Sequence, residues 1–150
     1  MASGGALWQG RRMDQRLSFV TLAARDLAAS RRFYLDGLGW RAALDVEGEV
    51  LMVKVADRVV LSLWDRDAFE AEVGPLAGGP GLAPLTLAHN VATREEVDAV
   101  LATARGAGAD PVHPGQERAW GGYTGYFADP DGYRWEIAWN PGPIGQEVLP

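Results

Sequence analysis

The sequence predicts an α+β fold in which two βαβββ modules form a curved mixed sheet around a cleft, with the helices on the outer face. The order strand, helix, strand, strand, strand occurs twice along the 150 residues, and capping and turn signals mark the boundaries of each copy. Each copy is too short to bury both faces of its own sheet, so the two are expected to pack side by side. The modules are predicted over 16–66 and 83–141.

The first module opens with "RLSFVTLAA" (16–24), a short apolar segment rich in strand formers. Asp26 is placed to cap the helix that follows, and Gly37 or Gly39 is placed to end it. The apolar stripe of this helix is expected to consist of Phe33, Tyr34 and Leu38. A strand followed by a capped amphipathic helix is therefore predicted.

The rest of the first module is predicted to form strands. Gly48 and the pair Asp57-Arg58 divide a long apolar stretch into three strands, predicted near 40–46, 49–55 and 58–64. A stretch rich in Gly and Pro follows, and residues 67–82 are predicted to be a mobile linker. Outside the modules, residues 1–15 are predicted to be a disordered extension and 142–150 a tail.

The second module repeats this order. "PLTLAHNVA" is a predicted strand, and Thr93 with Glu96 forms a capping box at the start of the next helix. Its apolar stripe falls at Val97, Val100, Leu101 and Ala104, and Gly106 and Gly108 end it. Three more strands are predicted near 111–115, 121–128 and 133–139. A type I turn is predicted at the Asp-Pro-Asp-Gly sequence of 129–132.

Composition excludes several classes of function. A net charge of −6 and a pI near 4.8 argue against nucleic acid or an anionic membrane as partner, because both need a basic surface. The chain has no cysteine, which excludes disulfides, cysteine zinc sites and a thiol nucleophile. No apolar run reaches transmembrane length. A cytoplasmic location is expected.

Two motifs resemble a known family. "RDLAASRRFYLDGLGW" early in the chain and "WGGYTGYFADPDGYRWEIAWNP" late in it are together similar to the vicinal oxygen chelate superfamily. That group contains glyoxalases, bleomycin-resistance proteins and extradiol dioxygenases, and this chain resembles a glyoxalase-like branch over 16–141. The resemblance implies paired βαβββ modules, frequent homodimers, and a cleft that holds a divalent metal in many members.

Glu136 is the most informative single residue of the late motif. Side chains alternate along a strand, so Tyr133, Trp135, Ile137 and Trp139 are expected on the face under the helices, and Glu136 on the opposite, cleft-facing side. The resemblance places the last carboxylate ligand of metal-binding members at this position. The competing interpretation is an ordinary half-solvated strand that carries a surface glutamate.

The resemblance also places the other metal ligands of the family. The four positions are occupied here by Phe19, Ser62, Thr86 and Glu136. Only the glutamate is a good ligand, because hydroxyl groups are weak neutral donors and a phenyl ring is none. No metal or other cofactor is therefore expected.

The two histidines are expected to lie elsewhere. His89 should face away from Thr86, hydrogen-bonded to the backbone near a strand end, although a bulge would turn it inward. His113 should face solvent on an edge strand.

The remaining predicted site residues line the cleft or its rim. By alternation, the inner face should carry Phe19, Thr21, Ser62, Trp64, Thr86, Ala88, Asn90, Arg134 and Glu136. Trp120 and Tyr123 are expected on a rim loop, and Tyr126 is expected to reach inward. An apolar wall with a few polar points is the ordinary make-up of a small-ligand pocket.

The sequence leaves three functions open. The first is a protein that binds a small aromatic or apolar molecule without a metal. The second is a metal-dependent lyase, isomerase or dioxygenase of the lactoylglutathione-lyase kind, which needs three more ligands than the sequence offers. The third is a metal-free enzyme in which Glu136 acts as a general base.

Overall fold

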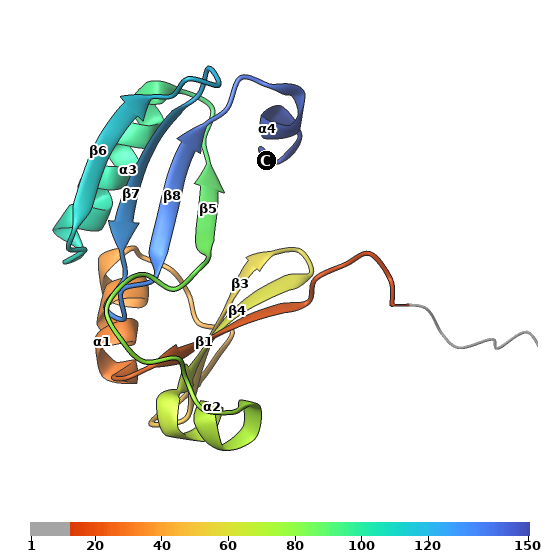
Figure 1. The fold of residues 1–150 in the computed structure, drawn as a ribbon, viewed down its shortest axis with the longest axis vertical. Coiled ribbons are helices and arrows are strands. Elements are labelled where there is room, and N and C mark those ends of the chain that lie inside the picture. The colour runs from red at the N-terminus through yellow and green to blue at the C-terminus, as the bar shows by residue number, and fades with distance from the viewer. Residues whose placement is uncertain (1–12) are drawn as a thin grey trace, which may run out of the picture.

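The structure, a computed structural model, describes residues 13–150 and contains two four-stranded sheets (Figure 1). Sheet A has the strand order β1-β4-β3-β2, and sheet B has the order β5-β8-β7-β6. In each sheet the first and last strands in sequence are parallel neighbours, and the other pairs are antiparallel. The strands of sheet A are β1 (Phe19–Ala24), β2 (Leu44–Val46), β3 (Val50–Ala56) and β4 (Val59–Asp65). Those of sheet B are β5 (Thr86–Asn90), β6 (Val112–Glu117), β7 (Tyr123–Ala128) and β8 (Arg134–Trp139).

This architecture confirms the predicted α+β class with two βαβββ modules. The first helix is α1 (Leu27–Arg31), continued by the π-helical segment η1 (Arg32–Gly37), and the second module contains α3 (Arg94–Gly106). Asp26 caps α1 and Thr93 caps α3, as their side chains predict. Strand β2 is shorter than the predicted strand over 40–46.

Two further helices lie where no helix was predicted. Helix α2 (Arg66–Val73) occupies the start of the predicted linker, and α4 (Pro143–Glu147) occupies the C-terminal tail. Asp65 caps α2 by accepting a hydrogen bond from the backbone N of Ala68 at 3.1 Å. The glycines and prolines that predicted a loop begin only after this helix, at Gly74.

The start of the described chain and the stretch after α2 lack regular structure. Residues 13–18 and 74–85 have no regular structure, and residues 1–12 of the predicted extension lie outside the described part. No helix in residues 13–150 combines the length and the apolar character needed to cross a membrane.

The two modules have the same internal register. In sheet A, Thr21 pairs with Ser62, and in sheet B, Ala88 pairs with Glu136. Ser62 and Glu136 therefore occupy equivalent positions, as the sequence predicts. Their neighbours Leu61 and Trp135 point the other way and are buried, as strand alternation requires.

A shared core joins the modules on the helix side of both sheets. Phe33 and Tyr34 of η1 are buried and reach across to sheet B. The ring centroid of Phe33 lies 5.9 Å from that of Phe127, and the Tyr34 centroid lies 6.4 Å from that of Trp135. Aromatic rings at these separations attract each other beyond the area they bury. The early and late motifs of the sequence thus meet in space.

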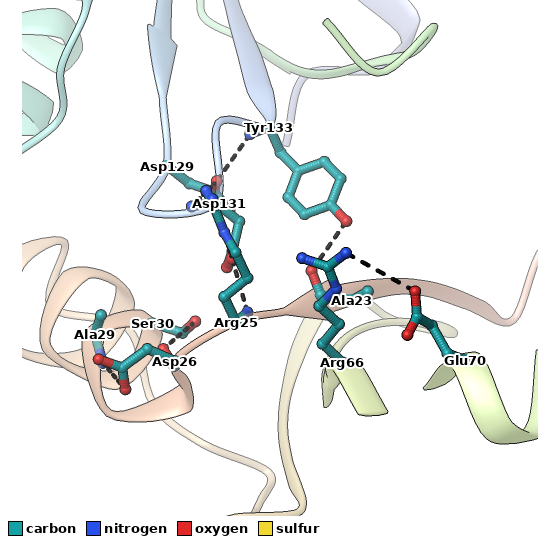
Figure 2. Close-up of polar contacts among 10 residues, drawn as sticks. All are labelled: Ala23, Arg25, Asp26, Ala29, Ser30, Arg66, Glu70, Asp129, Asp131 and Tyr133. Carbon is teal, nitrogen blue, oxygen red and sulfur yellow. Dashed lines mark hydrogen bonds and ion pairs between the residues drawn. The ribbon is translucent and has the colours of Figure 1, made fainter. Parts of the chain in front are cut away.

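The turn between β7 and β8 fastens the second module to the first (Figure 2). Asp131 accepts a hydrogen bond from the backbone N of Arg25 at 2.8 Å, and the Tyr133 hydroxyl donates to the carbonyl of Ala23 at 3.0 Å. The predicted type I turn is confirmed, because the backbone N of Gly132 donates to the carbonyl of Asp129 at 3.0 Å and neither central residue, Pro130 or Asp131, has a positive φ. We call this turn, residues 129–132, the latch.

Asp129 is the buried centre of the latch. Its Oδ2 accepts a hydrogen bond from the Tyr34 hydroxyl at 2.7 Å, which in turn accepts one from Trp135 Nε1 at 3.0 Å. Its Oδ1 accepts from the backbone N of Asp131 and of Tyr133 at 3.0 and 2.9 Å. One carboxylate therefore receives three hydrogen bonds, one of which comes from the other module.

A close approach between the modules is expected to make Gly37 intolerant of a side chain. A Cβ at this position would lie 2.5 Å from the Cβ of Ala107, just after α3. We expect Gly37→Ala to lower the free energy of unfolding by roughly 1 to 3 kcal/mol through overpacking, measured by urea denaturation. The matched control is Gly106→Ala, where a Cβ meets no atom within 4 Å and where alanine is expected to stabilise the helix. Equal effects of the two substitutions would contradict the close approach.

Candidate functional site

Glu136 lies on the face of sheet B opposite α3, which we call the Glu136 face. The Tyr126 hydroxyl donates a hydrogen bond to Glu136 Oε2 at 2.5 Å. The two residues are cross-strand partners in β7 and β8, and both side chains are half-buried. Directly opposed residues on one face of a sheet have neighbouring Cβ atoms, so the strand register itself creates this pair.

Arg118 extends the polar group along the same face. Its Nε donates to Thr124 Oγ1 at 2.7 Å, and its guanidinium carbon lies 5.9 Å from the centroid of the Tyr126 ring. Thr124 is buried and precedes Tyr126 by two residues on β7, so their side chains share one face. Sequence reasoning missed Arg118 because it lies in the loop after β6, where strand alternation gives no direction.

The proton of the Tyr126–Glu136 pair belongs to the phenol. The hydrogen bond to Glu136 raises the pKa of Tyr126, and partial burial raises it further. The pair therefore presents a carboxylate that already accepts one hydrogen bond. Within residues 13–150 its second oxygen, Oε1, accepts no hydrogen bond, so it can accept one from an N–H or O–H group of a bound molecule.

The other predicted residues of sheet B lie near this pair. Ala88 is the register partner of Glu136, and Thr86 is the partner of Arg134. The Arg134 guanidinium donates to the carbonyl of Gly132 at 3.4 Å. Asn90 is half-buried and pairs with Ala138. By alternation, the side chains of Thr86, Ala88, Asn90 and Arg134 point to the same side of the sheet as Glu136.

The predicted residues of sheet A form a second group. Thr21 pairs with Ser62, which is 3% exposed, whereas Phe19 is 50% exposed at the start of β1. The Trp64 ring makes an edge contact with Phe69 of α2 at 6.1 Å. In the described chain, no hydrogen bond joins Phe19, Thr21, Ser62 or Trp64 to the Tyr126–Glu136 pair. Their place in a ligand site remains a prediction.

The two rim aromatics differ in direction. Trp120 is exposed in the turn before β7, and its ring lies against Gly122. The Tyr123 hydroxyl instead donates to Asp98 Oδ1 of α3 at 2.7 Å. Tyr123 therefore lies on the helix side of sheet B, away from the Glu136 face.

The histidines fall on different surfaces. His89 lies on the helix side, as expected from its separation from Thr86, and pairs in register with Ile137. The expected hydrogen bond of its ring to the backbone is wrong, because no such bond forms in residues 13–150; the ring borders cavities between the modules instead. His113 is exposed on the edge strand β6.

A resident divalent metal does not fit the residues at the family's four positions. Phe19, Ser62 and Thr86 carry a phenyl ring and two hydroxyls, and Glu136 is engaged by Tyr126. Within residues 13–150, no three His, Cys, Asp or Glu side chains gather into a group that could hold a metal ion. A single carboxylate competes poorly with water for a divalent ion.

Comparison with known proteins decides the family. Residues 16–137 match the family model described as the Glyoxalase/Bleomycin resistance protein/Dioxygenase superfamily. The chain belongs to this superfamily. A comparison with curated proteins gave no match.

Solved structures of this superfamily resemble the chain closely. A glyoxalase-related enzyme from Fulvimarina pelagi is 35% identical, with a TM-score of 0.75 over 85% of this chain and 89% of its own. A glyoxalase/bleomycin resistance protein/dioxygenase from Nocardioides is 25% identical, with a TM-score of 0.72 over 87% and 90%. A lactoylglutathione lyase from Agrobacterium tumefaciens is 23% identical, with a TM-score of 0.65 over 86% and 96%, which shows the common fold.

Proposed function

We propose that this superfamily member binds a small aromatic or apolar molecule on the Glu136 face without a resident metal. The observation that carries the proposal is the Tyr126–Glu136 hydrogen bond at 2.5 Å on a half-buried sheet face. The bound molecule supplies an N–H or O–H donor to Glu136 and an apolar body to the surrounding side chains. The homodimer, the cytoplasmic location and the lack of nucleic-acid or membrane partners stay predictions.

Electrostatics supports a donor group on the ligand. Glu136 is an anion whose phenol partner keeps its own proton, so a second acceptor placed at Oε1 would be repelled. A half-buried carboxylate needs a donor to offset its lost hydration, and a ligand hydroxyl or amine provides one. The guanidinium carbon of Arg118 lies 5.9 Å from the centroid of the Tyr126 ring, and its positive charge balances the negative charge of the pair.

The test is a thermal-shift screen of small aromatic alcohols, amines and thiols against the wild type and Glu136→Gln. We expect compounds that raise the melting temperature of the wild type to lose most of that shift in Glu136→Gln, because an uncharged amide accepts a weaker hydrogen bond. The unliganded variant is expected to melt within a few degrees of the wild type, because a half-exposed residue contributes little to stability.

Two outcomes would contradict the proposal. If Glu136→Gln kept every ligand shift but lowered the melting point by many degrees, Glu136 would be a structural residue. If the purified wild type carried stoichiometric Ni, Zn, Mn or Fe by elemental analysis, and Glu136→Gln lost it, the metal-dependent alternative would replace this one. Arg58→Gln, an exposed residue between β3 and β4, is the control for a general change of surface charge.

A further inference from the structure

A cavity of about 510 Å³ lies between the two modules on the helix side of the sheets. Its wall on sheet A is one cross-strand row, Val20–Leu61–Val53. Its wall on sheet B is the equivalent row of the second module, which includes Leu87 and Trp135. The volume falls within the range of small-molecule pockets in proteins.

The aromatic side of this cavity is held rigidly. Trp135 is 7% exposed, and its indole N–H is fixed by the hydrogen bond to the Tyr34 hydroxyl. The Trp40 ring packs edge-on against Trp135, with centroids 5.7 Å apart, and tilts over Tyr34 at 5.4 Å. A wall fixed before binding lowers the entropy that a ligand must lose.

A smaller cavity of about 190 Å³ adjoins this aromatic wall. Trp40, His89 and Trp135 border both cavities. The smaller cavity is otherwise lined mainly by apolar side chains, including Leu38, Phe127 and Ile137. The two cavities therefore share part of their wall.

The charge at the mouth of the larger cavity has the opposite sign to the protein as a whole. Arg41 and Lys54 line it. Lys54 follows Val53 and leaves β3 on the opposite face, but it lies beyond Met52, the last residue that β2 pairs with, so its long side chain borders the cavity from an open strand edge. The described lining contains no Asp or Glu, although the chain carries a net charge of −6. Both cations are exposed, and within residues 13–150 neither forms an ion pair with a carboxylate. Their donors are available to an anionic ligand.

We infer that the cavity between the modules binds a small aromatic carboxylate, at a site separate from the Glu136 face. The ring occupies the apolar space beside Trp40 and Trp135, and the carboxylate meets Arg41 and Lys54 at the mouth. Arg offers a planar fork that fits a carboxylate, and Lys adds a point charge. The two sites lie on opposite faces of sheet B, because Trp135 and Glu136 are consecutive residues of one strand.

The test is isothermal titration calorimetry with 2-naphthoate and with its neutral counterpart of the same shape, 2-naphthamide. We expect the wild type to bind 2-naphthoate about tenfold more tightly than 2-naphthamide, the usual advantage of a charge-assisted hydrogen bond. The double variant Arg41→Gln, Lys54→Gln is expected to bind both probes equally. The indole N–H signals of Trp40 and Trp135 should shift on titration in ¹H–¹⁵N spectra, which places the ring.

Controls separate this site from the proposed function. Arg58→Gln removes an exposed positive charge from the β3–β4 turn outside the cavity and should preserve the tenfold preference. Val20→Trp fills the cavity and should weaken the binding of both 2-naphthoate and 2-naphthamide. If this variant does not fold, the double variant Arg41→Gln, Lys54→Gln still tests the inference, because both of its positions are exposed.

The inference is overturned if the two probes bind the wild type equally. It is also overturned if 2-naphthoate binding survives the double variant but is lost in Tyr126→Phe, because the probe would then occupy the Glu136 face. If the double variant loses the preference for 2-naphthoate over 2-naphthamide, the cavity site is supported. This conclusion does not depend on the result of the thermal-shift screen with Glu136→Gln.

Discussion

Replacing Asp129 by alanine is expected to lower the free energy of unfolding by about 3 kcal/mol at pH 5. The side chain is 4% exposed and accepts hydrogen bonds from the Tyr34 hydroxyl and from two backbone N–H groups of the latch. Each buried donor left without an acceptor costs roughly 1 to 3 kcal/mol, and water entering the space recovers part of that cost. Urea denaturation followed by tryptophan fluorescence measures the change.

The matched control for this substitution is Asp57→Ala. Asp57 also lies in a tight turn between two antiparallel strands, but it is exposed. A surface substitution of this kind changes stability by about 0.5 kcal/mol or less. If Asp129→Ala were as mild as Asp57→Ala, the latch would hold the modules together without help from its central carboxylate.

Stability is also expected to depend on pH through the same residue. Burial raises the pKa of Asp129 to about 6 from 3.8, against the hydrogen bonds from Tyr34 and Tyr133, which act to lower it. The folded state therefore holds this proton more tightly than the unfolded state. The resulting stabilisation is fully present below pH 3.8 and is lost as the pH rises through about 6.

The size of this effect follows from the pKa difference. About two pKa units correspond to roughly 3 kcal/mol between acidic and neutral pH. Other carboxylates titrate in the same range, so the measurement is the difference in unfolding free energy between the wild type and Asp129→Asn, which has no proton to lose at this position. We expect the wild type to lose roughly 3 kcal/mol relative to Asp129→Asn between pH 3.5 and pH 7. A difference that stays constant over this range would show that Asp129 titrates normally.

The latch links stability to the cavity between the modules. The Tyr34 hydroxyl that donates to Asp129 also accepts the indole N–H of Trp135, and Trp135 forms part of the cavity wall. A substitution in the latch therefore changes the shape of the cavity between the modules, because two hydrogen bonds connect Asp129 to Trp135 through Tyr34. Asp129→Ala should consequently weaken 2-naphthoate binding even under conditions in which the variant remains folded.

Local signals determined much of the fold in advance. The Asp26 and Thr93 caps, the apolar stripe of α3 and the Asp-Pro-Asp-Gly turn act over a few residues, so the sequence shows them directly. Strand alternation likewise placed Glu136 and Trp135 on opposite faces of β8. Helix α2 was missed because it leads directly into a stretch, beginning at Gly74, whose glycines and prolines predict a loop.

The sequence by itself determined the two-module α+β fold, the family resemblance and the direction of Glu136, because periodicity, capping and turn chemistry are local properties. Only the tertiary structure decided that Tyr126 donates to Glu136, that Asp129 joins the modules, and that Arg41 and Lys54 share a cavity with Trp135. These contacts connect residues on different elements. Strand pairing, helix packing and the meeting of two modules set them, and none of these distances is encoded within a short window of the chain.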